Sequence, residues 1–211
     1  MEDYWASPKI KKFFKNKNAN EYFEHLINNR NIKIPAGNIL DAGCGYGRNL
    51  MLFANDRYRK YAFDSSLESI QYTANRYGNI KTICSNIQSE PFIGCLFSAI
   101  VCDGVLHQLL SLDEFNSAIK YFSKIIICNG ILFLSLFINN PPPTGARETE
   151  KGIWKTDHGV FMLLQSPESI VEACRTNNFS LLYRHEKIIM LDEGARSNVE
   201  FVFIKENIKN A

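Results

Sequence analysis

The stretch Ile39-Leu40-Asp41-Ala42-Gly43-Cys44-Gly45-Tyr46-Gly47-Arg48-Asn49 decides the fold. It begins as a short apolar run, continues through three glycines spaced two residues apart, and ends where a helix can start. Glycine allows a tight turn and a close approach of the backbone to a ligand. The first turn of a helix also offers unpaired N–H groups. The stretch therefore predicts a nucleotide-cofactor loop between a buried strand and a helix.

The spacing of the glycines indicates which nucleotide the loop binds. Dinucleotide-binding loops read G-x-G-x-x-G, whereas this loop reads Gly43-x-Gly45-x-Gly47 and has Asp41 two places before the first glycine. A carboxylate beside the loop disfavours a pyrophosphate and suits a ligand with a cationic amino group. The pattern argues against NAD and favours a ligand such as S-adenosylmethionine.

At residues 41–47 the chain resembles the class I S-adenosylmethionine-dependent methyltransferases, whose first motif is an acidic residue followed by G-x-G-x-G. The resemblance implies an α/β fold, with a doubly wound, mostly parallel seven-stranded sheet whose last strand is antiparallel. It covers residues 35–211 as a single methyltransferase domain. Residues 1–34, which mix lysines with aromatic side chains, are expected to form an N-terminal helical lid whose lysines stay in solvent. A membrane-surface helix and a nucleic-acid contact are the alternatives for the same pattern.

The same resemblance assigns residues after the next two strands. Asp64 ends an apolar run about 20 residues after the loop, where this family and other doubly wound domains place the carboxylate that binds the ribose hydroxyls. Asn86 stands where the family usually has an Asp facing the adenine amino group, and its side-chain carbonyl could accept from that group. The predicted cofactor-binding residues are Asp41, Gly43, Cys44, Gly45, Gly47, Arg48, Asp64, Ser65, Asn86, Ile87 and Asp103. For Arg48, pairing with the cofactor's carboxylate and pairing with a nearby acid are both open.

The implied chemistry is an in-line displacement in which an acceptor atom attacks the sulfonium methyl group. Here the protein mainly orients the reactants and excludes water, and a general base is optional. His107 is the first candidate for such a base because it follows the fourth strand and can titrate near neutrality, and Asp103 is the second. The alternative for His107 is simple packing at a helix start.

The chain after the fifth strand contains a long segment rich in turn residues, 139–158, which we expect to be a functional loop at the cofactor edge. A helix capped by Ser166 is predicted over 166–177, followed by two antiparallel strands at 181–189 and 199–204. The segment between Asn86 and Phe97 contains Pro91 and is too short for a full crossover helix. The candidate substrate-binding residues are Tyr4, Trp5, His107, Arg147, Trp154 and His158, although an ordinary solvated loop would also account for the last three.

Composition is that of a one-domain enzyme, with 211 residues, 45% apolar and 22% charged. The formal net charge of +2 is too small to favour a nucleic-acid partner. Six cysteines without a C-x-x-C pair predict a reduced, cytoplasmic chain without a structural metal. We also expect no signal peptide and no membrane span.

The predicted acceptor is an oxygen or nitrogen atom of a small molecule. The turn Cys102-Asp103-Gly104-Val105 lacks the Asn/Asp-Pro-Pro-aromatic motif of methyltransferases that act on base amino groups. Three alternatives stay open at this stage: a tRNA-modifying methyltransferase, an inactive cofactor-binding subunit and, remotely, an NAD-dependent oxidoreductase. Asn86 and Ser98, which depart from the family pattern, keep the inactive subunit possible. The oligomeric state is left open.

Overall fold

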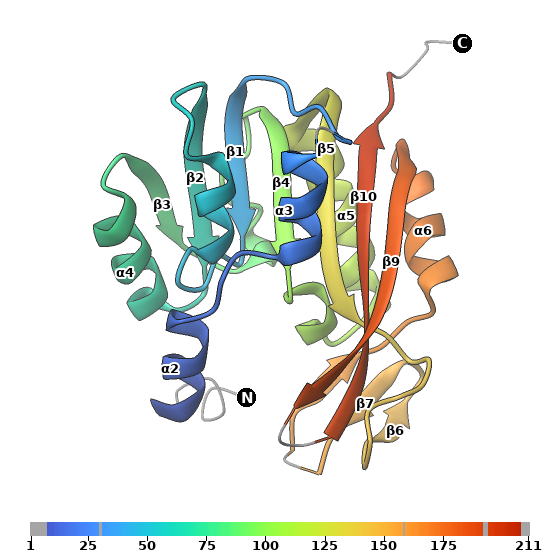
Figure 1. Ribbon diagram of the computed structural model, residues 1–211. Coiled ribbons are helices and arrows are strands. Elements are labelled where there is room, and N and C mark those ends of the chain that lie inside the picture. Colours follow the sequence, from blue (N-terminus) through green and yellow to red (C-terminus); the bar gives the residue numbers. More distant parts are fainter. Residues whose placement is uncertain (1–7, 30, 158, 192–193, 208–211) are drawn as a thin grey trace.

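A seven-stranded sheet forms the centre of the computed structural model, which describes residues 8–29, 31–157, 159–191 and 194–207 (Figure 1). Its strand order is β3-β2-β1-β4-β5-β10-β9, in which β1 to β5 are parallel and β10 is antiparallel to both of its neighbours. The strands are β1 Gly37–Ala42, β2 Tyr58–Asp64, β3 Ile80–Cys84, β4 Phe97–Asp103, β5 Ile126–Phe137, β9 Phe179–Leu191 and β10 Gly194–Lys205. This order confirms the predicted fold class, including the antiparallel last strand.

Helices cover both faces of the sheet, and most start at a side-chain cap. Asn20, Ser66, Ser111 and Ser166 each accept a hydrogen bond from an N–H of the first helical turn, which satisfies one of the donors that have no partner within the helix. The α-helices are α2 Pro8–Lys15, α3 Glu21–Asn28, α4 Leu67–Tyr77, α5 Leu112–Ile125 and α6 Pro167–Arg175. Figure 1 shows α3 in front of the sheet and α5 behind it. The helix predicted over 166–177 and its cap are confirmed.

Three short 3-10 helices, η1 Arg48–Phe53, η2 Ile87–Ser89 and η3 Leu106–Gln108, follow β1, β3 and β4. The shortened crossover predicted after Asn86 is therefore confirmed, since η2 and turns replace a full helix there. The helix expected directly after the glycine loop is instead the 3-10 helix η1. The last two strands are also longer than the predicted ranges 181–189 and 199–204.

The prediction of a loop over 139–158 is wrong for half of that segment. It contains β6 Arg147–Glu150 and β7 Ile153–Lys155, which pair with β8 Phe161–Leu163 in a small antiparallel sheet. Figure 1 shows β6 and β7 beyond the end of β5, beside the far end of the β9–β10 hairpin. Because β6 is polar and exposed throughout, the alternation that signals a half-buried strand is missing from it.

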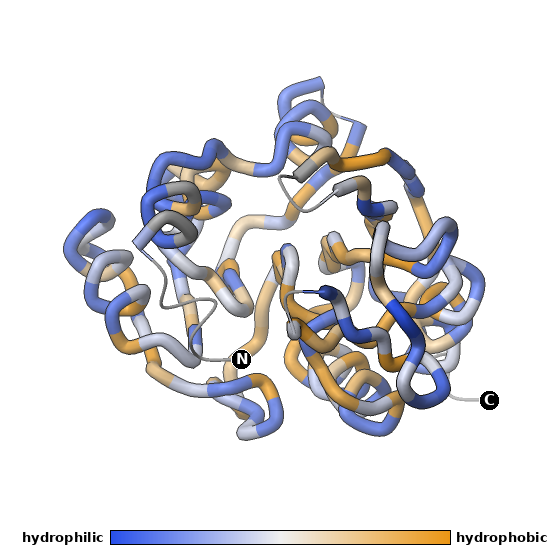
Figure 2. The backbone as a smooth tube through the Cα atoms, turned by 90° about the horizontal axis from the view of Figure 1, so that it is seen from below, coloured by the Kyte–Doolittle hydropathy of each residue, from blue (hydrophilic) through white to orange (hydrophobic). Residues whose placement is uncertain are grey.

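The core lies on both faces of the large sheet. One cluster joins α5 and α6 to the sheet, and another joins Phe23 and Leu26 of α3 to Phe133 on the opposite face. Viewed from the carboxyl edge of the parallel strands, the apolar segments lie mainly inside and the hydrophilic ones mainly around the periphery (Figure 2). No helix among the described residues is long and apolar enough to cross a membrane. The domain boundary placed at residue 34 stays a prediction.

We predict that Phe23→Ala destabilises the protein by about 3–5 kcal/mol, because Phe23 is fully buried and its ring stacks on Phe133 at 4.4 Å. Urea unfolding followed by circular dichroism measures the change. Glu24→Ala, at an exposed position of the same helix, is the matched control and should change the stability by less than about 0.5 kcal/mol. A Phe23→Ala effect as small as that of the control would show that α3 is not part of the core.

Candidate active site

The glycine loop is fastened to the end of β2. The N–H groups of Gly43 and Cys44 both donate to the carbonyl of Phe63, at 2.9 and 3.0 Å. Gly43 has a φ of +70°, and a Cβ atom on it would lie 2.2 Å from Val105 Cγ2, so only glycine fits there. Gly45 also has a positive φ, of +51°, but a Cβ on it would meet nothing within 4 Å. The middle of the loop therefore faces open space, as a cofactor-binding turn requires.

Asp64 ends β2 and reaches the same loop. Its Oδ2 accepts from Gly45 N at 2.8 Å and its Oδ1 from Ser66 N at 2.9 Å. Burial raises the pKa of Asp64, while these two hydrogen bonds oppose the rise. A carboxylate has about four lone-pair sites, so two are left after these bonds. The residue holds the loop in place and retains the capacity to accept from a pair of hydroxyl groups.

Asp41, near the end of β1, is a buried carboxyl group. It is 2% exposed, and its Oδ2 has no hydrogen-bond partner within the described part of the chain. Burial is the main cause that raises the pKa of Asp41 to about 8, the carboxylate of Asp103 adds to the rise, and Arg48 opposes it. A buried oxygen without a partner costs free energy unless a ligand satisfies it. The site therefore fits a group that brings a positive charge or a donor, such as the amino group of S-adenosylmethionine.

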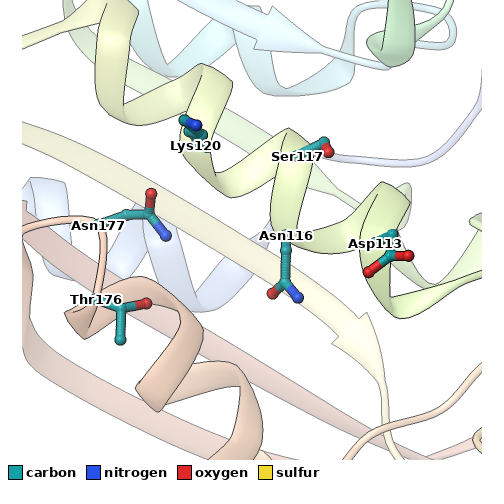
Figure 3. Close-up of a pocket in the computed structure, with 6 residues that line it drawn as sticks. All are labelled: Asp113, Asn116, Ser117, Lys120, Thr176 and Asn177. Atoms are coloured by element: carbon teal, nitrogen blue, oxygen red, sulfur yellow. The ribbon is translucent and has the colours of Figure 1, made fainter.

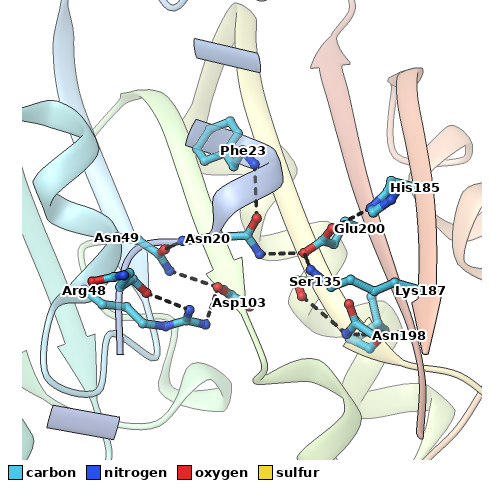
Figure 4. A network of polar contacts seen from close by, with 12 residues as sticks. Asn20, Phe23, Arg48, Asn49, Asp103, Ser135, His185, Lys187, Asn198 and Glu200 are labelled. Atoms are coloured by element: carbon cyan, nitrogen blue, oxygen red, sulfur yellow. Dashed lines mark hydrogen bonds and ion pairs between the residues drawn. The ribbon is translucent and has the colours of Figure 1, made fainter. Parts of the chain in front are cut away.

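Arg48 and Asp103 form an ion pair at the carboxyl edge, with Arg48 Nη2 2.5 Å from Asp103 Oδ2 and exposed side-chain fractions of 15% and 6% (Figure 4). Asn49 Nδ2 donates to the same oxygen at 3.2 Å. Of the two partners left open for Arg48, the structure shows the nearby acid. Among the residues predicted to bind the cofactor, these two thus contact each other directly.

A second buried acid continues this polar network toward the last strands (Figure 4). Glu200, 0% exposed, accepts from Asn20 Nδ2 at 2.8 Å and from Lys187 Nζ at 2.7 Å, and it pairs with His185 Nδ1 at 2.9 Å. The backbone N–H of Asn20 in turn donates to Asn49 Oδ1 at 2.9 Å. Sequence reasoning missed these residues, although a glutamate inside the apolar run 199–204 was a usable signal.

The side-chain oxygen of Asn86 is engaged within the chain. Its Oδ1 accepts from both the N–H and the hydroxyl of Ser89, at 3.0 and 2.9 Å, because Asn86 caps η2. The carbonyl expected to accept from the adenine amino group is thus already used twice. The amide nitrogen remains as a donor, which suits a ring nitrogen of adenine. The buried Ile87 follows directly.

His107 does not have the properties of a general base. It is 5% exposed, and burial lowers its pKa to about 3, with the positive charge of Arg196 adding to the effect. Its Nδ1 lies 3.3 Å from Phe137 N and accepts that N–H, so the other ring nitrogen carries the proton. The structure thus favours the packing alternative for this residue.

The predicted substrate residues are not all brought together. Trp154 lies on β7, where it packs beside Phe137 at the end of β5, whereas Arg147 is exposed on the outer strand β6. Tyr4, Trp5 and His158 lie outside the described residues. Of the remaining cofactor residues, Cys44 is buried below the loop and Ser65 is exposed beside Asp64.

Two surface hollows lie away from this edge. One, between α5 and the end of α6, is lined by Asp113, Asn116, Ser117, Lys120, Thr176 and Asn177 (Figure 3). The other lies at the amino end of the sheet, around Asn129 and Lys205. Ligand sites are mostly apolar with a few convergent polar groups, and the hollow in Figure 3 is lined by polar side chains alone. No group of three metal-binding side chains occurs in the part of the chain that the structure describes.

Comparison with known proteins identifies the fold and the domain. The family described as "Methyltransferase domain" matches residues 39–130, which contain the loop, Asp64, Asn86 and Asp103. Residues 39–130 thus match a methyltransferase domain, and the chain has the fold of the class I methyltransferases. No curated protein sequence matches it. The predicted family and fold are confirmed.

Solved structures share this fold at low sequence identity. The 1,6-didemethyltoxoflavin-N1-methyltransferase of Burkholderia thailandensis, with bound 1,6-didemethyltoxoflavin and S-adenosylhomocysteine, is 16% identical, with a TM-score of 0.71 over 98% of this chain and 87% of that one. The N-methyltransferase NodS of Bradyrhizobium japonicum, in complex with S-adenosylhomocysteine, is also 16% identical, with a TM-score of 0.67 over 98% of this chain and 96% of that one. The [4+2]-cyclase SpnF is 16% identical, with a TM-score of 0.65 over 88% of this chain and 80% of that one. The two methyltransferase complexes agree with the predicted cofactor.

The buried carboxyl group of Asp41 generates a prediction about the pH dependence of cofactor binding. A cationic group near Asp41 favours its ionised form, so cofactor binding releases a proton wherever Asp41 is protonated beforehand. We expect the Kd for S-adenosylhomocysteine to fall by up to about tenfold per pH unit from about pH 6 to about pH 7.5. Isothermal titration calorimetry in buffers of different ionisation enthalpy measures both affinity and proton release.

Asp41→Asn is the control for this prediction and should bind more weakly with no proton release. In the unliganded protein the raised pKa of Asp41 makes a stabilising contribution below about pH 4 that is lost as the pH rises to about 8. The variant should therefore have a higher Tm than the wild type at about pH 8 without ligand. Equal proton release by both proteins would show that Asp41 does not sense the cofactor.

Proposed function

We propose that this chain transfers a methyl group from S-adenosylmethionine to an oxygen or nitrogen atom of a small molecule. The observation that carries the proposal is the combination of Asp41, Gly45 and Asp64 at one edge of the sheet. Asp41 supplies a buried oxygen without a partner among the described residues, Gly45 an open turn, and Asp64 a carboxylate with lone pairs to spare. These features suit an amino group, a nucleoside and a ribose diol, which occur together in this cofactor.

The cofactor residues take separate roles in this proposal. Asp64 accepts from the two ribose hydroxyls, and Asp41 faces the amino group of the methionine part. The Asn86 amide nitrogen and the segment at Ile87 bind the adenine ring. Arg48 acts through Asp103, whose position it fixes by the ion pair at 2.5 Å.

When bound, S-adenosylmethionine would supply a methyl group on a positively charged sulfur. The acceptor's lone pair would bond to the methyl carbon while the carbon–sulfur bond breaks and its electrons stay on the sulfur. The chain's residues contribute by holding the reactants in line and by excluding water, which can supply roughly 7–11 kcal/mol of the barrier reduction. The acceptor loses its proton to water or to a nearby carboxylate. Of the two predicted bases, Asp103 is the better candidate to take this proton. The Nδ1 lone pair of His107 is engaged by the N–H of Phe137.

A small-molecule acceptor is supported by what the compared proteins act on. The Burkholderia enzyme is an N1-methyltransferase of a small heterocycle, as its name states. The cyclase SpnF shows that this fold also carries other chemistry, so the acceptor and the reaction need a direct assay. The net charge of +2 is likewise too small to favour a nucleic-acid acceptor.

We expect S-adenosylmethionine and S-adenosylhomocysteine, at about 100 times their Kd, to stabilise the fold by roughly 2.7 kcal/mol, and NAD to leave it unchanged. A thermal shift assay measures this effect. Asp64→Ala should weaken both adenosyl ligands by about 10- to 100-fold, since two charge-assisted hydrogen bonds are lost. Asp56→Ala, which removes an exposed carboxylate just before β2, is the matched control and should bind like the wild type.

The outcomes separate the parts of the proposal. No stabilisation by either adenosyl ligand would exclude the methyltransferase function. Stabilisation together with unchanged binding by Asp64→Ala would reject the site assignment alone. With binding shown, product formation from radiolabelled methyl donor and a panel of amine, phenol and heterocyclic acceptors tests the transfer itself.

A further inference from the structure

Several buried polar atoms near the end of β5 have no hydrogen-bond partner. Within the described residues, the side-chain atoms of this kind are Asn38 Oδ1, Asp41 Oδ2, Trp154 Nε1, Gln165 Nε2, Ser197 Oγ and Asn198 Oδ1. Asp41 belongs to the cofactor site, and Asn38 lies at the opposite edge of the sheet, near the start of β1. The other four lie on the small sheet of β6, β7 and β8, called the accessory sheet below, on the segment after it, or on β10. Leaving such a buried group without a partner costs free energy, so a concentration of them points to a ligand.

Asn198, on β10 beside the end of β5, has a side-chain carbonyl oxygen among these atoms. Its Nδ2 donates to the carbonyl of Leu136 at 3.0 Å and lies 3.4 Å from Ser135 Oγ. Only the nitrogen can donate to a carbonyl, so the orientation of the amide is fixed and Oδ1 is the atom without a partner. Asn198 is 4% exposed and pairs in register with Phe137, which puts both side chains on one face of the sheet.

This face is also the face of Asp103. Asp103 is in register with Ser135 on β5, and Ser135 is in register with Glu200 on β10, two residues from Asn198. Figure 4 shows Asp103, Ser135 and Asn198 in one network region at the carboxyl edge. Asn198 on β10 thus lies two strands away from Asp103 on β4, on the same face of the sheet.

Phe137 lies between Asn198 and the accessory sheet. Its partly exposed ring lies 4.6 Å from the ring of His107 and 5.3 Å from the guanidinium carbon of Arg196. It also packs against the cluster that contains Trp154 and Met162. The indole Nε1 of Trp154, a donor, is buried and has no partner within the described part of the chain. Phe137 thus has a residue with a buried acceptor, Asn198, as its register partner, and it packs against the same cluster as Trp154, which has a buried donor.

We propose that the methyl acceptor is a planar aromatic molecule that carries an N–H or O–H group close to a carbonyl or ring nitrogen. Flat rings stack well on an aromatic side chain such as Phe137. Asn198 Oδ1 accepts from the N–H or O–H group and so orients the atom that receives the methyl group, while Trp154 Nε1 donates to the carbonyl or ring nitrogen. This inference rests on the proposed methyltransferase function and specifies its substrate class.

The test uses the full chain with saturating S-adenosylhomocysteine and Trp154 as reporter. The sequence has two tryptophans, so Trp5→Phe leaves Trp154 as the only one. The probes are four planar lactams, namely lumazine, hypoxanthine, uracil and 2-quinolone, and the aliphatic amine glucosamine. We expect at least one lactam to change Trp154 fluorescence saturably and glucosamine to leave it unchanged. Failure of all four lactams, or binding by glucosamine alone, overturns the proposal.

Variants then test the two polar contacts by calorimetry with the bound lactam. Asn198→Ala should raise its Kd about tenfold, the loss of about one hydrogen bond. Trp154→Phe keeps the aromatic packing, removes only the N–H, and should have a similar effect, which keeps the test decisive if Asn198→Ala folds poorly. Asn38→Ala is the matched control, because Asn38 Nδ2 also donates to a backbone carbonyl, that of Leu96, and its Oδ1 is also buried without a partner.

The control variant should bind like the wild type, and equal Kd values for wild type, Asn198→Ala and Trp154→Phe would overturn the assignment of the contacts. The titration of S-adenosylhomocysteine alone separates this inference from the proposed function. If that ligand does not bind, the methyltransferase function itself fails. If it binds and no planar ring does, only the proposed acceptor class is wrong.

Discussion

Three carboxyl groups on one face of the sheet constrain much of the rest of the site. Asp41, Asp103 and Glu200 are buried on β1, β4 and β10, and an unpaired buried charge is too costly to keep. The structure meets this cost in three ways. Burial raises the pKa of Asp41 so that it can be neutral, Arg48 pairs with Asp103, and Lys187, His185 and Asn20 surround Glu200.

These contacts make the N-terminal helices part of the site as well as its cover. Asn20 caps α3, donates from its side chain to Glu200, and donates from its backbone to Asn49, which in turn binds Asp103. One residue outside the predicted methyltransferase domain thus connects the cofactor edge to the last two strands. A fold built without residues 1–34 would leave Glu200 with fewer donors and the α3 side of the core exposed.

The sequence was informative where a function depends on neighbouring residues. The glycine loop, Asp64 and the cap of α6 are local patterns, and the structure places them as predicted. The sequence was less informative where partners come from distant parts of the chain. The burial of His107 depends on packing against Phe137 and on Arg196, and no spacing rule brings these residues together. The strands β6 and β7 were also missed, since pairing with β8 and not their own pattern makes them strands.

The same distinction separates the two halves of the site. The proposed cofactor half is built from turns that directly follow β1 and β2, so a short stretch of sequence can specify it. The proposed acceptor half lies where β5, β10 and the accessory sheet meet around Phe137. Its polar atoms are set by strand register and by an insertion, both of which can change without disturbing the glycine loop. Low-identity relatives of this fold can therefore keep one cofactor site and differ in acceptor, and the acceptor must be inferred from this chain's own Asn198, Trp154 and Phe137.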